Sequence, residues 1–177
     1  SYSARLDLGG GVILTLCHPL DYMRWLLGEV SALWAFVRRL NDFEIMVEDT
    51  VEIGLQFESG TVGSVNLNYN QRPRSQLVEI VGVEGTLRWE NETGAVRIYR
   101  ARESGNSGDR SESWESHEVP NNFDRNDMFM AEMKHFLEIM KGKAQPMCSL
   151  NDGCKALELA LAAHKSSRKG QLIKLRE

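Results

Sequence analysis

The sequence predicts an α+β domain with an open, largely antiparallel sheet of about six to eight strands and helices packed on one face. Short segments with apolar residues at every second position follow one another through the first two thirds of the chain, and glycine-containing turns separate them. Two longer segments with apolar residues at helical spacing come last. Because the connections between strands are short, we expect an antiparallel meander followed by two helices.

The first three strands are expected at residues 32–38, 49–57 and 61–69. In the second of them, Val51, Ile53 and Leu55 alternate with polar or small neighbours, which indicates that one face is buried. A tight turn at Glu58-Ser59-Gly60 leads into the third strand. The second and third strands are therefore expected to form a hairpin.

Later strands are expected at residues 76–81, 86–90, 95–100 and 114–119. Gly82, Gly85 and Gly94 separate them as turn residues. Residues 101–112 consist of Ser, Gly and charged residues with hardly an apolar side chain. This composition predicts an exposed loop before the last strand.

Two helices are expected at residues 126–141 and 150–168. The first has Asp124 as a candidate cap, and the second has Ser149 followed three residues later by Asp152, the spacing of a capping box. One apolar stripe on the first helix predicts that it packs into the core. The stripe consists of Phe129, Met133, Phe136, Leu137 and Met140.

Composition and charge restrict the possible functions. The chain has 177 residues, 42% of them hydrophobic and 26% charged, as in a soluble globular domain. A net charge of −4 offers no basic surface for nucleic acid, and no apolar run reaches the roughly 18 residues that span a bilayer. We therefore expect a cytoplasmic protein with neither nucleic acid nor membrane as a partner. The chain starts without methionine and enters an apolar segment at once, so we expect a fragment of a longer protein.

The cysteines and histidines give no sign of a metal site. Cys17, Cys148 and Cys154 lack the Cys-x-x-Cys spacing of a zinc site, and their odd number does not indicate a disulfide framework. The other histidines have no partners at metal-ligand spacing, and no metal is predicted. They are His117, His135 and His164.

The segment from Gly9 to Gly28 carries the candidate chemistry. It is an apolar run that leads into a helix, and its glycines lack the G-x-G-x-x-G spacing of a phosphate loop. Pro19 suits the first helical position, which would make His18 the cap and Asp21 the third residue. The positive end of the helix dipole favours a neutral imidazole, as a general base requires.

Two interpretations of His18 and Asp21 stay open at this point. Asp21 would oppose the dipole if it reached the imidazole, or it could bond back to the amide of His18 as in a capping box. Alternatively, both residues only cap the helix. Spacing by itself favours the capping interpretation.

Five segments in order resemble the Gfo/Idh/MocA oxidoreductase family at its second domain. They are residues 9–28, 57–63, 82–87, 129–136 and 149–153. Together they extend over nearly the whole chain. The resemblance implies that residues 1–177 form a single substrate and oligomerisation domain with the dihydrodipicolinate-reductase-like C-terminal fold.

The resemblance also implies an NAD(P)-dependent dehydrogenase that acts on a CH–OH group of a sugar, cyclitol or related hydroxy compound. NAD or NADP would be bound mainly by an N-terminal Rossmann domain that is absent here, so the isolated chain is expected to be inactive. His18 would be the catalytic acid/base, while its lysine partner would lie in a Glu-Lys-Pro motif that this chain lacks. Many members carry an aspartate four residues before the histidine, where this chain has Leu14. Either Asp21 substitutes for it or the chemistry is altered.

Further candidate substrate contacts, besides Asp21, are Tyr69, Arg72 and Arg125. Tyr69 and Arg72 lie where a strand runs out towards Pro73, and Arg125 starts a helix, a place that favours an anionic or hydroxylated ligand. Surface exposure and helix capping are the alternative explanations.

A polar row is expected on the third strand and beyond it, at Asn66, Asn68, Asn70 and Arg72. It faces either a substrate, solvent or a second subunit, since the resemblance implies a homodimer or homotetramer formed through the sheet. The alternative to an enzyme is a non-catalytic dimerisation or ligand-binding module derived from the same fold.

Overall fold

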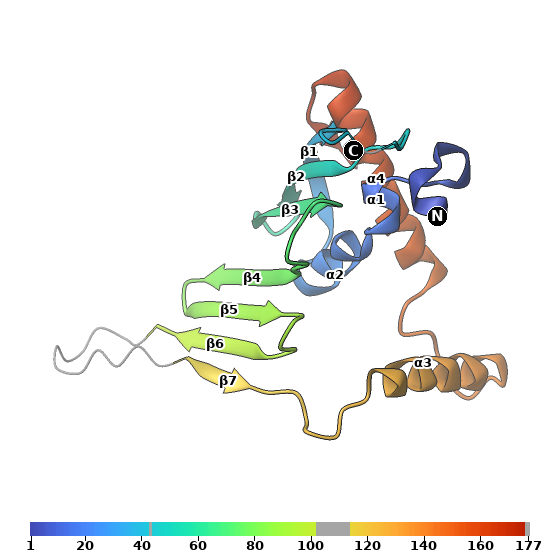
Figure 1. Cartoon of the computed structure of the whole chain (residues 1–177). Helices are drawn as coiled ribbons and strands as arrows, with labels where there is room; N and C mark the ends of the chain where they lie inside the picture. The colour runs from blue at the N-terminus through green and yellow to red at the C-terminus, as the bar shows by residue number, and fades with distance from the viewer. Residues whose placement is uncertain (43, 102–113, 176–177) are drawn as a thin grey trace, which may run out of the picture. The chain divides into compact units, whose positions relative to one another are not determined.

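The structure is a computed structural model that describes residues 1–42, 44–101 and 114–175 (Figure 1). Two short 3-10 helices, Tyr2–Ala4 and Leu6–Leu8, precede the other elements. The helices are α1 (Val12–Thr15), α2 (His18–Leu27), α3 (Arg125–Met140) and α4 (Leu150–Lys169). The strands are β1 (Val30–Arg38), β2 (Thr50–Phe57), β3 (Val62–Asn68), β4 (Leu77–Gly82), β5 (Gly85–Glu90), β6 (Val96–Arg100), β7 (Glu115–His117) and β8 (Ile173–Lys174).

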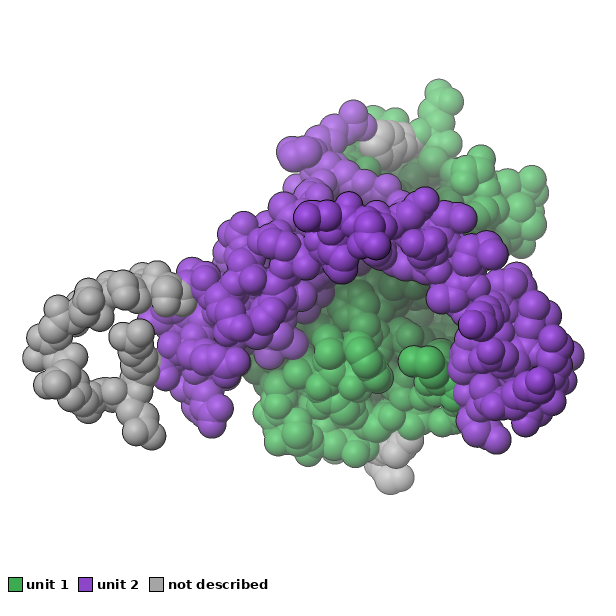
Figure 2. Space-filling view, turned by 90° about the horizontal axis from the view of Figure 1, so that it is seen from below, with its two compact units in different colours: residues 1–70, 146–177 green, residues 71–145 purple. Residues whose placement is uncertain are grey.

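The chain divides into two compact units, coloured separately in Figure 2. The first consists of residues 1–70 and 146–177, and the second of residues 71–145. The first unit contains α1, α2, α4 and one sheet, and the second contains α3 and the other sheet. The assignment of residues 1–177 to a single substrate-side domain stays a prediction.

The sheet of the first unit has the order β3-β2-β1-β8, with antiparallel pairing throughout. Leu33 of β1 lies opposite Leu55 of β2, and Ile53 of β2 lies opposite Val65 of β3. Because side chains alternate across a strand, this register places the apolar residues on one face. The hairpin predicted from Glu58-Ser59-Gly60 is confirmed.

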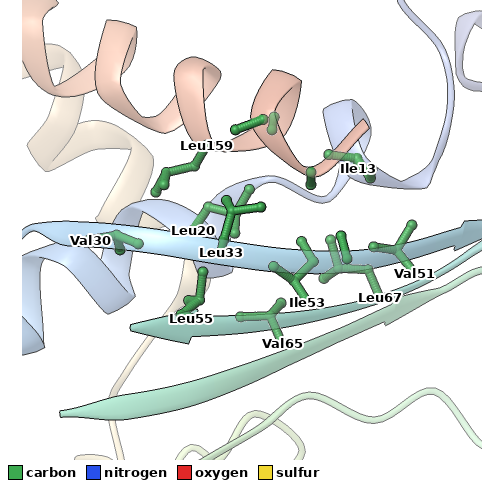
Figure 3. Close-up of a cluster of buried hydrophobic side chains, with 14 of the residues drawn as sticks. Ile13, Leu20, Val30, Leu33, Val51, Ile53, Leu55, Val65, Leu67 and Leu159 are labelled. Atoms are coloured by element: carbon green, nitrogen blue, oxygen red, sulfur yellow. The ribbon is translucent and has the colours of Figure 1, made fainter. Parts of the chain in front are cut away.

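The core of the first unit lies between this face of the sheet and the helices α1, α2 and α4. Figure 3 shows Leu159 of α4, Leu20 of α2 and Ile13 of α1 close to the side chains of the strands. Leu20, Leu33 and Ile13 are fully buried. Burial of this apolar surface is the main favourable contribution to the folding of the unit.

Helix α4 also completes the hydrogen bonding of β1. The short strand β8 pairs with only Ala32 and Leu33. Farther along β1, two backbone amides donate to serine hydroxyls of α4. Ala35 N donates to Ser166 Oγ and Val37 N donates to Ser167 Oγ, each at 3.0 Å. These serines satisfy backbone donors that an edge strand would otherwise leave open.

The second unit contains a meander with the order β4-β5-β6-β7, again antiparallel. Val78 lies opposite Trp89 and Ile80 opposite Leu87, and these side chains are only half-buried. Most of the loop predicted at residues 101–112 lies outside the described residues.

The predicted α+β class is confirmed, and the eight strands of the described chain are shared between two four-stranded sheets. In the first unit the helices cover one face of the sheet, as predicted. The chain leaves the first sheet after β3 and enters the second at β4. The connection contains Pro73, which has no amide hydrogen and cannot donate a hydrogen bond to a neighbouring strand.

Both long helices are where the sequence predicts them. Asp124 Oδ1 accepts a hydrogen bond from Asn126 N at 2.9 Å, which confirms the cap of α3. At α4, Ser149 N donates to Asp152 Oδ2 at 2.9 Å and Asp152 N donates to Ser149 Oγ at 3.2 Å. This confirms the capping box.

The predicted core packing of α3 is wrong for the described chain. Apart from Ile139, its large apolar side chains are about half exposed or more, and α3 has no buried residue. The exposed set includes Phe129, Met133, Phe136, Leu137 and Met140. Helical spacing shows that a face is apolar, but it does not show what covers that face.

Within the described ranges, no helix combines the length and the apolar character needed to cross a bilayer.

A matched pair on β3 tests the location of the core. Val65 is 5% exposed on the helix-covered face, whereas Val62 is 76% exposed. We expect Val65→Ala to lower the free energy of unfolding by about 2 to 3 kcal/mol, because it removes two buried carbon groups and leaves a cavity. Val62→Ala should change it by no more than about 0.5 kcal/mol. Urea unfolding of both variants measures the difference, and equal effects would contradict the assigned register.

Candidate functional site

The glycine segment allows close packing of the backbone ahead of α1. A Cβ atom on Gly10 would lie 2.6 Å from the carbonyl oxygen of Ser3, and one on Gly11 would collide with the carboxylate of Glu48. Gly11 also has a φ of +110°, which side chains disfavour. Gly11 therefore allows the approach of Glu48 to the helix, and Gly10 allows the first residues of the chain to pack closely.

Glu48 holds the start of α1. Its carbonyl oxygen accepts a hydrogen bond from Val12 N at 3.1 Å, and its carboxylate accepts one from Ile13 N at 3.2 Å. His164 Nε2 of α4 lies 3.7 Å from the same carboxylate. Because a carboxylate already occupies this amino terminus, the site does not suit a phosphate group.

Asp49 holds the segment that presents Glu48. It is fully buried, and its carboxylate accepts hydrogen bonds at 3.0 Å from the amides of Leu40 and Asn41. Burial opposes ionisation, but these bonds and one from Thr50 Oγ1 outweigh it and hold the pKa of Asp49 below its ordinary value. The charged carboxylate thus ties the connection between β1 and β2 back onto β2.

Tyr69 lies beside α1 at the end of β3. Its hydroxyl is hydrogen-bonded to Thr15 Oγ1, which in turn donates to Gly11 O at 2.6 Å. The ring packs against the core, and burial raises the pKa of Tyr69. The hydroxyl therefore stays protonated and is already engaged within the protein. A substrate contact at Tyr69 stays a prediction.

His18 is the first residue of α2, and its side chain is exposed. The predicted cap was wrong by one residue: Cys17 occupies the cap position without a side-chain bond, and Pro19 takes the second helical position. Pro19 suits this position equally well, because no amide in the first turn has a partner within the helix. Leu14 packs against the core, so its side chain is surrounded by apolar residues.

Asp21 lies one turn after His18, is half-exposed, and pairs with Arg24 in the following turn of α2. Its Oδ1 lies 3.7 Å from Nη1 of Arg24, an i,i+3 ion pair. This ion pair runs towards the end of the helix, whereas the two contacts considered for Asp21, with the imidazole or with the amide of His18, both lie at its start. A role for Asp21 in substrate binding stays a prediction.

Arg24 is the centre of a charged cluster that the sequence analysis missed. It is only 9% exposed, and it binds Glu29 with two hydrogen bonds, Nη2 to Oε1 at 2.8 Å and Nε to Oε2 at 3.2 Å. It also lies 3.4 Å from Asp152 Oδ1, while Lys155 Nζ donates to Glu29 Oε1 at 2.7 Å. The cluster joins α2, the start of β1 and the start of α4.

The cluster lowers the pKa values of its acids. Hydrogen bonds from Arg24, with a smaller contribution from Lys155, lower the pKa of Glu29 to about 2 against the opposing effect of burial. Hydrogen bonds from the Ser149 side chain and backbone, assisted by Arg24, lower the pKa of Asp152 to about 2. Both carboxylates are therefore charged at neutral pH.

Arg72 and Arg125 belong to the second unit, whereas His18, Asp21 and Tyr69 belong to the first. Arg72 is exposed and precedes Pro73. Arg125 starts α3, with its guanidinium 5.9 Å from the ring centroid of Phe129. Their substrate contacts stay predictions.

Among the described residues, no group of three His, Cys, Asp or Glu side chains is arranged to hold a metal ion. The three cysteines are free.

Comparison with known proteins gives the chain its family. The model of the oxidoreductase family, C-terminal alpha/beta domain, matches residues 5–175. The chain belongs to the Gfo/Idh/MocA oxidoreductase family. This confirms the resemblance found in the five sequence segments.

Curated relatives of this family member are sugar and cyclitol dehydrogenases. The chain is 30% identical over 171 residues to a D-apiose dehydrogenase of Paraburkholderia graminis, covering 90% of this chain and 43% of the relative. It is 29% identical over 183 residues to a myo-inositol 2-dehydrogenase of Thermotoga maritima, covering 97% of this chain and 51% of that relative. The chain thus spans about half the length of the curated relatives it matches.

Solved structures share the fold. A levoglucosan dehydrogenase in complex with NADH and L-sorbose superposes with a TM-score of 0.86 at 19% identity, covering 100% of this chain and 53% of the other. The WlbA dehydrogenase of Bordetella pertussis, in complex with NADH and UDP-GlcNAcA, gives a TM-score of 0.70 at 23% identity, covering 95% and 46%. At these identities the likeness concerns the fold.

The acid sensitivity of the cluster can be tested with Glu29→Gln. A carboxylate with a depressed pKa contributes stability above its unfolded value of 4.5, and the contribution is lost as the pH falls through about 2. We expect the variant to be less stable than the wild type by about 1 to 3 kcal/mol at pH 7, less than for a fully buried pair because Glu29 is half-buried. The difference should shrink between pH 4.5 and 2, as followed by urea unfolding.

Glu79→Gln is the matched control, because Glu79 also pairs with an arginine, but the Arg88 side chain is 40% exposed whereas that of Arg24 is 7% exposed. We expect its effect to stay below about 1 kcal/mol. A Glu29→Gln difference that did not change with pH would contradict the assigned pairing.

Proposed function

We propose that this chain is the substrate-side half of an NAD(P)-dependent dehydrogenase that oxidises a sugar, cyclitol or related hydroxy compound, or reduces the matching ketone. Family membership and the dehydrogenase activities of the curated relatives support the reaction class. The observation that carries the proposal for this chain is the exposed imidazole of His18 at the start of a helix anchored by buried charge.

His18 would exchange a proton with the hydroxyl group of the substrate. An exposed imidazole at the first helical position can reach a bound hydroxyl, and histidine is the side chain most often used as a general acid or base. Leu14 cannot hydrogen-bond the ring, and Asp21 is oriented towards Arg24. We infer that His18 acts here without the aspartate that many family members carry at the position of Leu14.

NAD or NADP would be bound outside this chain and would accept or supply the hydride. In the described part of the chain, the glycine segment does not suit a dinucleotide phosphate, because Glu48 fills the amino terminus of α1 and Gly10 is packed against backbone oxygen atoms. This fits the length of the relatives, which are about twice as long as the chain.

His18→Ala tests the catalytic role in the longer protein that contains this chain. We expect kcat to fall by roughly 10² to 10⁴, the usual contribution of a general acid or base, in a hydride-transfer assay against a panel of sugars and polyols. The free energy of unfolding should be nearly unchanged because the side chain is exposed. His117→Ala, at another exposed histidine, is the control and should keep wild-type turnover. Full turnover in His18→Ala would refute the role.

A second candidate function is self-association through the sheet of the first unit. Its face away from the helices is open, and Trp34 and Phe36 lie exposed on it with their ring centroids 6.1 Å apart. Beside them lies a polar row in which Asn68 Nδ2 donates to Asn66 Oδ1 at 2.7 Å, and Asn66 is bonded to Glu52. Exposed aromatic rings with a polar border are typical of a protein interface. We infer a homodimer or homotetramer formed by this face.

Phe36→Lys tests this interface. A charged side chain at the centre of an isologous contact meets its own copy, so we expect the dissociation constant of the dimer to rise by about 10-fold to 100-fold. Leu157→Lys is the control, because Leu157 is equally exposed but lies on α4, beyond the other face of the sheet. Sedimentation equilibrium measures both variants. A wild-type monomer at high concentration would exclude the interface.

A further inference from the structure

We propose that Arg24 is a positioning residue for His18, because from the last turn of α2 it ties the helix both to Glu29 and to the amino-terminal cap of α4. The proposal rests on the proposed role of His18 for its effect on turnover, but its structural part does not depend on that role.

Arg24 connects α2 to the sheet through Glu29. Glu29 follows Gly28, the residue that caps the end of α2, and receives two hydrogen bonds from the guanidinium. The carbonyl oxygen of Glu29 also accepts a hydrogen bond from Glu58 N, at the turn between β2 and β3, at 2.9 Å. The acceptor of Arg24 is therefore itself fixed to the strands, and the helix is tied to a rigid point.

Arg24 connects α2 to α4 through Asp152. Oδ2 of Asp152 is engaged in the capping box with Ser149, which leaves Oδ1 for Arg24 at 3.4 Å. The carbonyl oxygen of Asp152 lies 3.5 Å from Nη1 of Arg24. One turn later, Lys155 donates to Glu29. Glu29 thus receives bonds from both helices, and the two cations, Arg24 and Lys155, lie among three carboxylates, since Arg24 also pairs with Asp21.

The apolar contacts of α2 cannot do this by themselves. Leu20 is fully buried and Met23 packs against the core, which determines the face of the helix that is turned inward. Apolar contacts have no directional preference, so they restrict the tilt of the helix less than hydrogen bonds do. The hydrogen bonds of Arg24 are directional, and the burial of the guanidinium reduces their screening by salt, although both acceptor carboxylates are partly exposed.

A guanidinium is required at this position. It presents several donors in a planar fork and can therefore bind Glu29 with two bonds while it reaches Asp152. A lysine would keep the charge, but its single ammonium group cannot reproduce both sets of bonds in the same geometry. Arg24 and His18 are six residues apart, about 9 Å along the helix axis, so a small tilt at Arg24 displaces His18. Displacements of about 1 Å can cost roughly 10² in rate.

Amide hydrogen exchange on this chain tests the structural part without any assay of turnover. We expect Arg24→Lys to accelerate exchange at residues 22–27 of α2 by at least about 10-fold, while the amides of β2 and β3 stay within about 2-fold of wild type. Arg88→Lys is the matched control, since Arg88 also binds a glutamate, Glu79, in an exposed pair of the second unit. It should leave α2 unchanged. Equal acceleration in α2 and in the strands, or none in α2, would overturn the proposal.

Turnover of the longer protein tests the consequence for His18. We expect Arg24→Lys to lower kcat by about 10-fold to 100-fold with KM within about 3-fold, because bound substrate would meet a displaced imidazole. Arg88→Lys should keep both constants. If His18→Ala has full turnover, the proposed function fails, whereas local acceleration of exchange in α2 still supports the anchoring by Arg24. If His18→Ala is impaired and Arg24→Lys keeps its kcat, the positioning role is refuted.

Discussion

The packing of α4 on β1 is the interaction on which the first unit depends. Leu159, Ala160 and Ala163 of α4 are buried against the sheet, and the hydroxyl of Ser166 accepts the amide of Ala35. Ser166 also donates to Gln171 O at 2.7 Å, so its hydroxyl is bonded twice in a fully buried place. The helix therefore covers the apolar face and satisfies the edge of β1 at once. Since α4 comes from the end of the chain, the first unit is completed only when residues 146–177 return to residues 1–70.

The candidate site is built on this packing. The start of α4 supplies Asp152 and Lys155 to the charged cluster around Arg24, and a later turn supplies His164 beside Glu48. The long helix α4 thus contacts the cluster of α2 near its own start, and farther along it contacts Glu48, which binds α1. His18 lies at the start of α2, and its side chain is exposed on a helix that Arg24 and the buried Leu20 hold against the rest of the unit. A site with an exposed functional group on a fixed helix is what proton transfer requires.

Apolar residues that remain exposed distinguish this chain from an ordinary small domain. The stripe on α3 and the aromatic pair Trp34 and Phe36 both leave large side chains open. Apolar patches of this kind are usually covered by further protein.

Local features of the chain were decided by the sequence itself. Alternation in residues 49–57 determined which face of β2 is buried, Ser149 with Asp152 determined the start of α4, and the ordered segments determined the family. These depend on side chains a few residues apart, so periodicity and capping chemistry suffice. The sequence also indicated His18, but it predicted this residue as the cap of α2, whereas His18 is the first residue of the helix.

Long-range features were decided only by the tertiary structure. Arg24 meets Asp152 across 128 residues, Ile13 meets Glu48 across 35, and β8 pairs with β1 through two residues. No local pattern identifies such partners, because any acid of the chain could in principle serve. The exposure of the α3 stripe likewise depends on what lies next to it in space. Spacing along the chain determines which residues share a face, and only packing determines what that face touches.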